Sequence, residues 1–247
     1  MRFRRFVALG DSLTTGVGDY YPDGKLRGFA DLLAHSVSVN NPPAVYANLA
    51  RPSVRAAEVL ADQVPAAVAL CPDLISVVAG INDIIAVRYP VESIARVIQQ
   101  IFAELHEQCP QATIVTALLP DLGHASLVAR LLKGRVAALN DATNRAANRH
   151  GVIVIDLGQP HPLSRGELAL DRIHPSALGH LRFARAYAEA LGLPAPNPQY
   201  VGDRPRAESL RRAYRTAVVA PRFVTRRLAR KTFIVQQPAK RGELSAL

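Results

Sequence analysis

Three short segments, far apart in the chain, carry residue types that together suit nucleophilic attack on a carbonyl carbon. The first is Gly10-Asp11-Ser12, which ends an apolar run over residues 6–9. Such a run, bounded by glycine, is typical of a buried strand. Ser12 then lies at the carboxyl edge of a sheet, where α/β folds keep their ligand sites. Taken alone, the segment is more simply an ordinary turn, because Gly10 permits a sharp bend and Asp11 accepts hydrogen bonds from loop amides.

The second segment is Asp171-Arg172-Ile173-His174, followed by a proline that begins a helix. A serine hydroxyl is a weak nucleophile unless a neighbouring imidazole takes its proton, and His174 is the candidate base. The three-residue spacing allows the Asp171 carboxylate to reach the imidazole Nδ1, fix the tautomer and stabilise the imidazolium. A capping or surface role for Asp171 is the alternative.

The third segment, Gly80-Ile81-Asn82-Asp83, follows a continuous apolar run over residues 74–79. The Asn82 side-chain N–H₂ is suited to donate to a developing oxyanion, an interaction worth about 3–4 kcal/mol in such sites. Gly80 lets the backbone approach closely. A β-turn after a strand explains the same residues without chemistry.

Alternating apolar strands and helices are expected to position these segments. Strands are predicted over residues 7–9, 44–49, 74–79, 112–118 and 152–155, and helices over residues 28–33, 54–70, 91–106, 127–150 and 175–191. This alternation predicts a parallel sheet covered on both faces. The carboxyl ends of parallel strands meet at one edge, so residues distant in sequence converge there.

The three segments, in this order and at this wide separation, resemble three of the four blocks of the SGNH hydrolases, also called GDSL esterases and lipases. The similarity spans residues 5–192. It implies a flavodoxin-like three-layer α/β/α sandwich with a five-stranded parallel sheet in the order 2-1-3-4-5. It also implies a carboxylic ester hydrolase without a cofactor, in which Ser12 is the nucleophile, His174 the base and Asp171 its orienting acid.

The resemblance further implies an oxyanion hole made by the Ser12 amide, the Asn82 side chain and a backbone amide in the second block. In this family a glycine usually follows five residues after the asparagine that ends the second strand; here that position is Ser53, after Pro52. Ser53 retains an N–H, but its side chain restricts φ. A non-catalytic binding module with the same fold is therefore the alternative function. Gly10, Asp11, Gly80 and Asp83 are expected to support the site.

The preferred hypothesis is hydrolysis of a carboxylic ester through an acyl-enzyme on Ser12. The low aromatic content, the lack of tryptophan and the glycine-containing loop Gly16–Gly18 favour a shallow pocket for short-chain acyl or O-acetyl esters. Thioesters and a peptidase-like activity use the same mechanism and remain open. The expected partner is a small or lipid-like ester substrate.

The basic charge is concentrated at the C-terminus. Residues 201–247 hold 12 Lys and Arg against 3 Asp and Glu, whereas the first 200 residues hold 18 against 17. A nearly neutral main domain gives no support for nucleic-acid binding. We expect a catalytic domain over 1–193, a proline-rich linker over 194–206 and a basic, partly helical extension over 207–247.

Residues 207–220 have the periodicity of an amphipathic helix. Two interpretations of the extension stay open: peripheral contact of residues 207–231 with an anionic membrane or acidic partner, or a helix docked on the domain with a solvated basic face and a mobile terminus.

Several protein classes are disfavoured by the sequence. The seven histidines show no paired metal-ligand spacing, so no metal is expected. The two cysteines are predicted to be free thiols, which is typical of a reducing compartment. We see no secretory signal and no run of the ~18 apolar residues that a membrane helix needs, and therefore expect a cytoplasmic protein with possible peripheral membrane contact.

Overall fold

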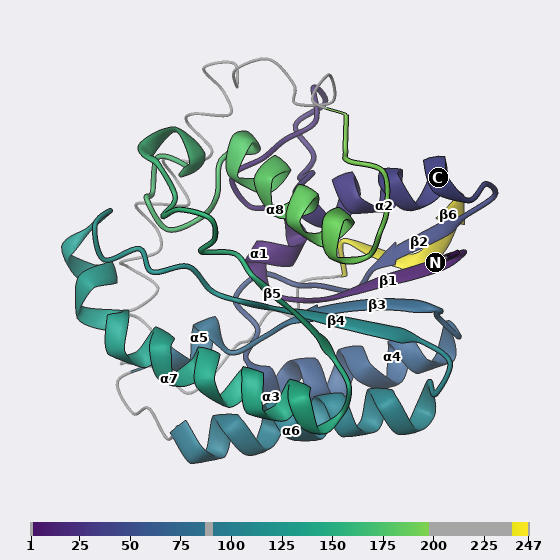
Figure 1. The fold of residues 1–247 in the computed structure, drawn as a ribbon, viewed down its shortest axis with the longest axis horizontal. Helices are drawn as coiled ribbons and strands as arrows, with labels where there is room; N and C mark the ends of the chain where they lie inside the picture. Colours follow the sequence, from purple (N-terminus) through teal and green to yellow (C-terminus); the bar gives the residue numbers. More distant parts are fainter. Residues whose placement is uncertain (1, 87–90, 198–238, 247) are drawn as a thin grey trace.

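A six-stranded, mostly parallel sheet forms the centre of the protein (Figure 1). The computed structural model describes residues 2–86, 91–197 and 239–246. In chain order the strands are β1 (Arg5–Gly10), β2 (Val45–Asn48), β3 (Leu74–Val78), β4 (Thr113–Leu118), β5 (Ile153–Asp156) and β6 (Arg241–Ala246). Their spatial order is β5-β4-β3-β1-β2-β6. The first five strands are parallel and confirm the predicted order 2-1-3-4-5.

The central strands β1 and β3 are buried because helices cover both faces of the sheet. All five side chains of β3 are buried, and in β1 only the first residue is exposed. Val7 lies opposite Ala47 of β2 on one side and Ile75 of β3 on the other. Continuous aliphatic strands of this kind are typical of parallel sheets with two covered faces.

Two helical layers complete the predicted sandwich (Figure 1). One face carries α2 (Phe29–Asn40) and α8 (Ala177–Ala190); the other carries α3 (Ala56–Glu58), α4 (Val64–Ala69), α6 (Val91–Gln108) and α7 (Leu127–Arg149). Each face has its own apolar core. The first contains Phe29 and Tyr187, whose rings stack 4.9 Å apart, and the second contains Ile98, Ile101 and Phe102.

Local sequence signals explain where several helices begin or change geometry. Ser126 caps α7 by accepting a hydrogen bond from the Ala129 N–H, and Ser176 caps α8 in the same way. A π-helical segment, Val59–Gln63, joins α3 to α4. It ends two residues before Pro65, which has no N–H to donate to the preceding turn. The helix predicted over residues 54–70 is therefore three consecutive pieces.

Besides the short 3-10 helix η2 (Arg165–Glu167), three elements of the described residues were not predicted from the sequence. Two are short helices at the sheet edge, α1 (Ser12–Thr15) and α5 (Ile81–Ile84), where turns and loops were expected. The third is β6, which pairs antiparallel with β2 and raises the expected five strands to six. The helix predicted over residues 207–220, the proposed membrane-contact segment 207–231 and most of the linker lie outside the described residues.

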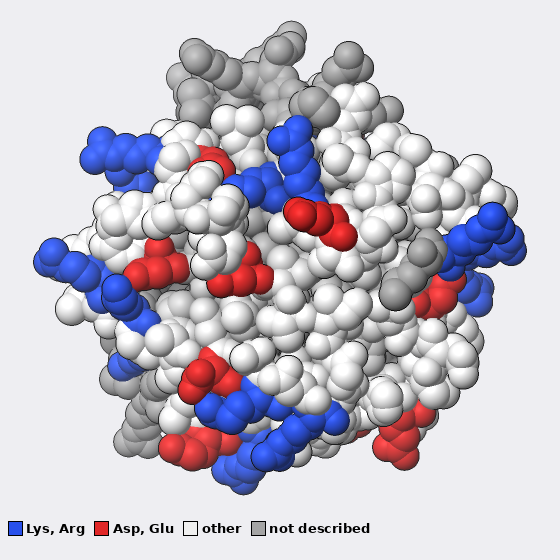
Figure 2. All heavy atoms as spheres, in the orientation of Figure 1, with Lys and Arg blue, Asp and Glu red and all other residues white. Residues whose placement is uncertain are grey.

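Charged side chains are dispersed over the face shown in Figure 2, with basic and acidic groups intermixed. This agrees with the near-neutral balance of the first 200 residues. Among the described helices, none combines the length and the apolar character needed to cross a bilayer.

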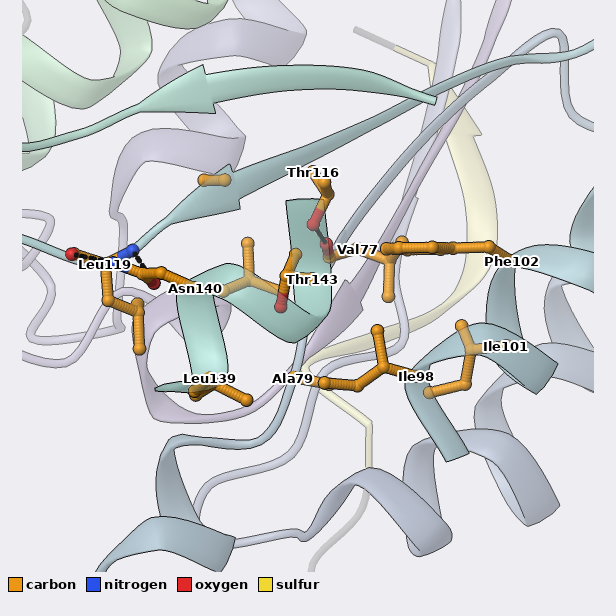
Figure 3. A pocket seen from close by; sticks show the side chains of 12 residues that line it. Val77, Ala79, Ile98, Ile101, Phe102, Thr116, Leu119, Leu139, Asn140 and Thr143 are labelled. Carbon is orange, nitrogen blue, oxygen red and sulfur yellow. Dashed lines mark hydrogen bonds between the residues drawn. The ribbon is translucent and has the colours of Figure 1, made fainter. Parts of the chain in front are cut away.

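A small void lies between the sheet and the helices α6 and α7 (Figure 3). Its volume is about 10 Å³, which is at most enough for one water molecule. Beside it, the Asn140 side chain of α7 bonds to both backbone groups of Leu119, at 2.8 Å each. This void is a packing feature on the opposite side of the strands from α8, and no predicted site residue lines it.

Candidate active site

Ser12, His174 and Asp171 form one continuous hydrogen-bonded chain. The Ser12 Oγ lies 2.9 Å from His174 Nε2, and His174 Nδ1 lies 2.7 Å from Asp171 Oδ2. The side chains of His174 and Asp171 are largely buried, with 22% and 16% exposed. These residues were predicted to lie at one edge of the sheet, and the structure brings them together there.

The Asp171 carboxylate is held in its ionised form by its neighbours. Burial by itself raises the pKa of a carboxyl group, but the bond to the His174 ring and the N–H groups of His174 and Ile173 outweigh it. The pKa of Asp171 is therefore below its usual value. An ionised carboxylate on Nδ1 keeps that nitrogen protonated and leaves Nε2 free to accept the serine proton.

The loop that carries His174 is anchored to α8 and to the turn after β1. The Ala169 N–H donates to the His174 carbonyl at 2.8 Å. Gly18 packs directly against the start of α8, since a Cβ there would lie 2.0 Å from the Pro175 carbonyl oxygen. The buried His180 accepts from the Phe29 N–H and donates to the Val17 carbonyl, each at 3.1 Å. These contacts fix the distance between the serine and histidine segments.

The turn that presents Ser12 requires glycine at its first position. Gly10 has φ of 143°, and a Cβ there would lie 2.5 Å from both Thr14 Oγ1 and the Val78 carbonyl oxygen. The buried Gln63 side chain donates to the Gly10 carbonyl and accepts from the Gly10 N–H, at 2.9 and 2.8 Å. Gln63 thus supplies the Gly10 N–H with its acceptor, shares the Gly10 carbonyl with the Arg51 N–H at 3.2 Å, and holds the end of β1 in place.

Asn82 lies beside Asp11 rather than alone at the end of β3. Its Nδ2 donates to the Val54 carbonyl at 2.9 Å and to Asp11 Oδ2 at 3.3 Å. Asp11 also caps α1 through the Leu13 N–H. Asp83, next to Asn82, accepts from the Ala56 N–H at 2.9 Å and so connects α5 to α3. The longer bond to Asp11 is the one that an incoming oxyanion would most easily replace.

Ser53 adopts the backbone conformation that glycine favours. Its φ is 66°, and it follows Pro52 in a turn of the loop between β2 and α3, hereafter the β2–α3 loop (residues 49–55). Proline followed by a residue with positive φ is the pattern of a type II turn, where glycine is preferred. Within the described residues, the Ser53 N–H has no acceptor. Ser53 therefore keeps the turn that glycine favours and adopts a strained, positive φ in it; the turn does not change to one that serine prefers.

Two fully buried titratable groups flank the site with pKa shifts in opposite directions. Burial raises the pKa of Asp11 to about 6, partly opposed by the Leu13 N–H and by the charge of His174. Burial lowers the pKa of His180 to about 4, partly opposed by the hydrogen bond to the Val17 carbonyl and by the charge of Asp19. Burial also raises the pKa of Asp83.

Sequence reasoning missed Gln63, His180 and the anchoring part played by Asn48. The Asn48 side chain donates to the Thr14 carbonyl at 3.0 Å and accepts from the Ala50 N–H at 3.1 Å. The role of Asn48 could have been suspected, because it is the polar residue at the end of an apolar strand. Gln63 and His180 lie within helical segments, and no local sequence pattern marks them. Among the described residues, no group of three or more His, Cys, Asp or Glu could hold a metal ion.

Comparison with known proteins identifies the class of enzyme that this fold and site define. A model of the GDSL-like lipase/acylhydrolase family matches residues 8–182, well over half of the chain. The chain therefore belongs to that family and is an ester hydrolase of the SGNH/GDSL type. The comparison with curated proteins found no match.

Solved structures share the fold at low sequence identity. A lipase/acylhydrolase from Enterococcus faecalis is 20% identical, with a TM-score of 0.60 over 78% of this chain and 99% of the other. A GDSL-like lipase from Parabacteroides merdae is 15% identical, with a TM-score of 0.63 over 76% and 95%. An acetyl xylan esterase from Geobacillus stearothermophilus is 18% identical, with a TM-score of 0.58 over 76% and 94%.

Substitutions at Ser53 should reveal the strain in its turn. We expect Ser53→Gly to leave the free energy of unfolding within about 1 kcal/mol of wild type, because relief of strain and the greater freedom of unfolded glycine oppose each other. Ser53→Val should cost about 1–3 kcal/mol, since a β-branched residue is poorly tolerated at positive φ. Urea denaturation measures both. Ser38→Val, in the regular helix α2, is the matched control and should cost less; equal costs would argue against strain at Ser53.

Asp11 and His180 should make opposing contributions to the pH dependence of stability. Asp11, with its pKa raised from 3.8 to about 6, stabilises fully below pH 3.8, and this contribution is lost as the pH rises to about 6. His180, with its pKa lowered from 6.5 to about 4, stabilises fully above pH 6.5, and this contribution is lost as the pH falls to about 4. Each amounts to about 3 kcal/mol.

In Asp11→Asn the free energy of unfolding should therefore rise more steeply between pH 4 and 6 than in wild type. In His180→Gln it should rise less steeply or fall. Urea denaturation of the three proteins at pH 4, 5, 6 and 7 gives the slopes. Parallel curves for all three would show that neither buried group titrates as described.

Proposed function

We propose that this enzyme hydrolyses carboxylic esters through an acyl-enzyme formed on Ser12. The observation that carries the proposal is the hydrogen-bonded chain from Ser12 through His174 to Asp171, at 2.9 and 2.7 Å. The Ser12–His174 distance is within the range in which a base takes a proton directly, and the His174–Asp171 distance is that of a hydrogen bond that orients the imidazole. The family to which the chain belongs supports ester hydrolysis in general.

In the proposed reaction, Ser12 Oγ bonds to the ester carbonyl carbon while its proton passes to His174 Nε2. The tetrahedral intermediate collapses as the C–O ester bond breaks and His174 protonates the leaving alcohol. Water then attacks the acyl-enzyme, giving its proton to His174, and release of the acid returns that proton to Ser12. Asp171 stays ionised throughout and stabilises the imidazolium in both steps.

Three donors are proposed to stabilise the oxyanion. Ser12 is the first residue of α1, so its N–H has no acceptor within the helix. The Ser53 N–H is free of acceptors among the described residues. The third donor is the Asn82 amide, whose N–H bonds to the oxyanion in place of Asp11. Gly80, which precedes α5, has a left-handed backbone conformation. A Cβ at this position would lie 2.7 Å from Leu139 Cδ1, so glycine leaves room for the Leu139 side chain.

We propose short-chain acyl or O-acetyl esters as substrates. Three exposed apolar side chains, Leu170, Ile173 and Leu178, lie on the loop and helix that flank His174. Exposed side chains provide contact area for a substrate lying across the surface, such as an acylated larger molecule. The acetyl xylan esterase among the structural neighbours supports the same class of substrate.

Ser12→Ala should lower kcat on p-nitrophenyl acetate by at least about 10⁴-fold, and His174→Ala by a comparable factor, because the members of a catalytic unit act together. Steady-state kinetics on purified proteins give the factors, with Ser38→Ala as a matched serine control that should remain active. A fluorophosphonate probe should label wild type but not Ser12→Ala. Equal turnover by wild type and Ser12→Ala would refute the serine mechanism, and failure to label wild type would favour the non-catalytic alternative.

A series of p-nitrophenyl esters should show the acyl preference. We expect kcat/KM to be highest for two- to four-carbon acyl groups. A surface-bound acyl group gains little from added methylenes, whereas a buried channel gains about 0.8 kcal/mol for each one. Initial rates are measured below the micelle concentration of each ester. A steady rise in kcat/KM from acetate to decanoate would contradict the short-chain proposal.

A further inference from the structure

The C-terminal strand brings a lysine into a buried cluster on α2. Asp31, only 8% exposed, accepts hydrogen bonds from the Tyr46 hydroxyl at 2.9 Å and the Tyr21 hydroxyl at 3.0 Å. Lys240 Nζ lies 3.0 Å from the same carboxylate and also donates to the Arg27 carbonyl. The Lys240 side chain is 15% exposed, so this is a buried ion pair between the chain's end and its first helical layer.

The cluster continues from Asp31 to the active-site backbone. The Tyr46 hydroxyl, which donates to Asp31, accepts from Asn48 Nδ2 at 3.0 Å. Asn48 in turn bonds to the Thr14 carbonyl in α1 and to the Ala50 N–H in the β2–α3 loop. One side chain thus holds both the helix that begins with the candidate nucleophile and the loop that carries a candidate oxyanion donor.

The C-terminal strand also bonds to that loop through its backbone. The Lys240 N–H donates to the Ala50 carbonyl at 3.3 Å, and Arg241 pairs with Asn48 in the sheet register. The Arg241 guanidinium lies over the Tyr46 ring, 5.3 Å from its centroid. Side-chain and backbone contacts therefore converge on the same short stretch after β2.

The direction of the hydroxyl hydrogen in this chain depends on the charge of Asp31. An ionised Asp31 can only accept, so the Tyr46 hydroxyl must donate to it and present a lone pair to Asn48. Without Lys240 the Asp31 carboxylate loses an ion-pair partner 3.0 Å away, and the position of the Tyr46 hydroxyl that donates to it is then less closely fixed.

We propose that Lys240 is a positioning residue of the active site. By holding the Asp31 carboxylate in place it fixes the hydrogen-bonded chain through Tyr46 to Asn48, and so holds α1 and the β2–α3 loop at their catalytic spacing. The C-terminal strand is then part of the active-site scaffold and not only an appendage. The kinetic effect of this positioning rests on the serine esterase function proposed above.

The test is Lys240→Met in the full-length protein. We expect kcat on p-nitrophenyl acetate to fall by about 10-fold or more with KM within about twofold, since small displacements of reacting groups act mainly on the chemical step. Lys240→Arg, which retains charge and donors, should recover most of the activity. Lys133→Met removes a lysine from an exposed ion pair with Asp121 and should leave kcat unchanged.

Amide hydrogen exchange gives a second readout that does not depend on turnover. In Lys240→Met, exchange should accelerate in residues 11–16 and 48–54 and stay unchanged in β4. Wild-type kcat together with wild-type exchange in both segments would overturn the proposal, even if the melting temperature falls. If wild type proves inactive on esters, the esterase proposal fails, and the exchange data alone decide whether Lys240 orders these segments.

A double variant covers the case in which Lys240→Met does not fold. Asp31→Asn/Lys240→Met removes both buried charges, so no unpaired ion remains. The proposal expects this protein to fold with low kcat and rapid exchange in the two segments. Wild-type kcat in the double variant would show that the ion pair stabilises the fold without positioning the site.

Discussion

The hydrogen bond between Ser12 and His174 sets the demands on the rest of the structure. It joins residues 162 positions apart at 2.9 Å, and such a bond weakens steeply with small changes in distance or angle. Neither residue lies within a long regular element: Ser12 begins a four-residue helix and His174 ends a loop. The precision has to come from what surrounds them. On the histidine side, the position is fixed by the contact between Gly18 and Pro175 and by the two hydrogen bonds of the His180 ring. On the serine side, it is fixed by the two hydrogen bonds between Gln63 and Gly10.

The same surroundings bury two titratable groups whose charged forms are disfavoured by burial. Asp11 is placed where burial disfavours its charge, and His180 where burial disfavours protonation. Near neutral pH the burial of ionised Asp11 lowers the free energy of unfolding. The burial of His180 does not, because His180 is then neutral in both the folded and the unfolded chain. In the proposed mechanism the charge of Asp11 is opposite to that of the imidazolium formed when His174 takes a proton, which offsets part of this cost. Its carboxylate also orients the Asn82 amide.

Sequence predicted those features that have a local signature. Buried parallel strands are recognised as short apolar runs, and the Ser12, Asn82 and Asp171–His174 segments each follow such a run or precede a helix, so the strands and the candidate site residues could be predicted. The strand order could not be predicted from these runs and came from the resemblance to the SGNH hydrolases. Gln63 and His180 were not, because a polar residue within a helix gives no sign of whether it faces solvent or a backbone 53 or 151 residues away. The conformation of Ser53 was also hidden, since residue identity alone argues against a positive φ there.

The last strand shows why tertiary context decides the structure of a polar segment. Arg241–Ala246 reads as the end of a basic tail, with a glycine, an arginine and a glutamate among six residues, and nothing in it favours a strand. Its partner β2 would otherwise be an open edge whose N–H and C=O groups invite pairing with another chain. A short strand with charged residues covers this edge and is itself a poor edge for pairing with another chain. β2 ends at the candidate active site, so pairing along its edge also positions the residues that follow it. Lys240 and Arg241, which lie outside the family's motifs, contact Ala50 and Asn48 in this way.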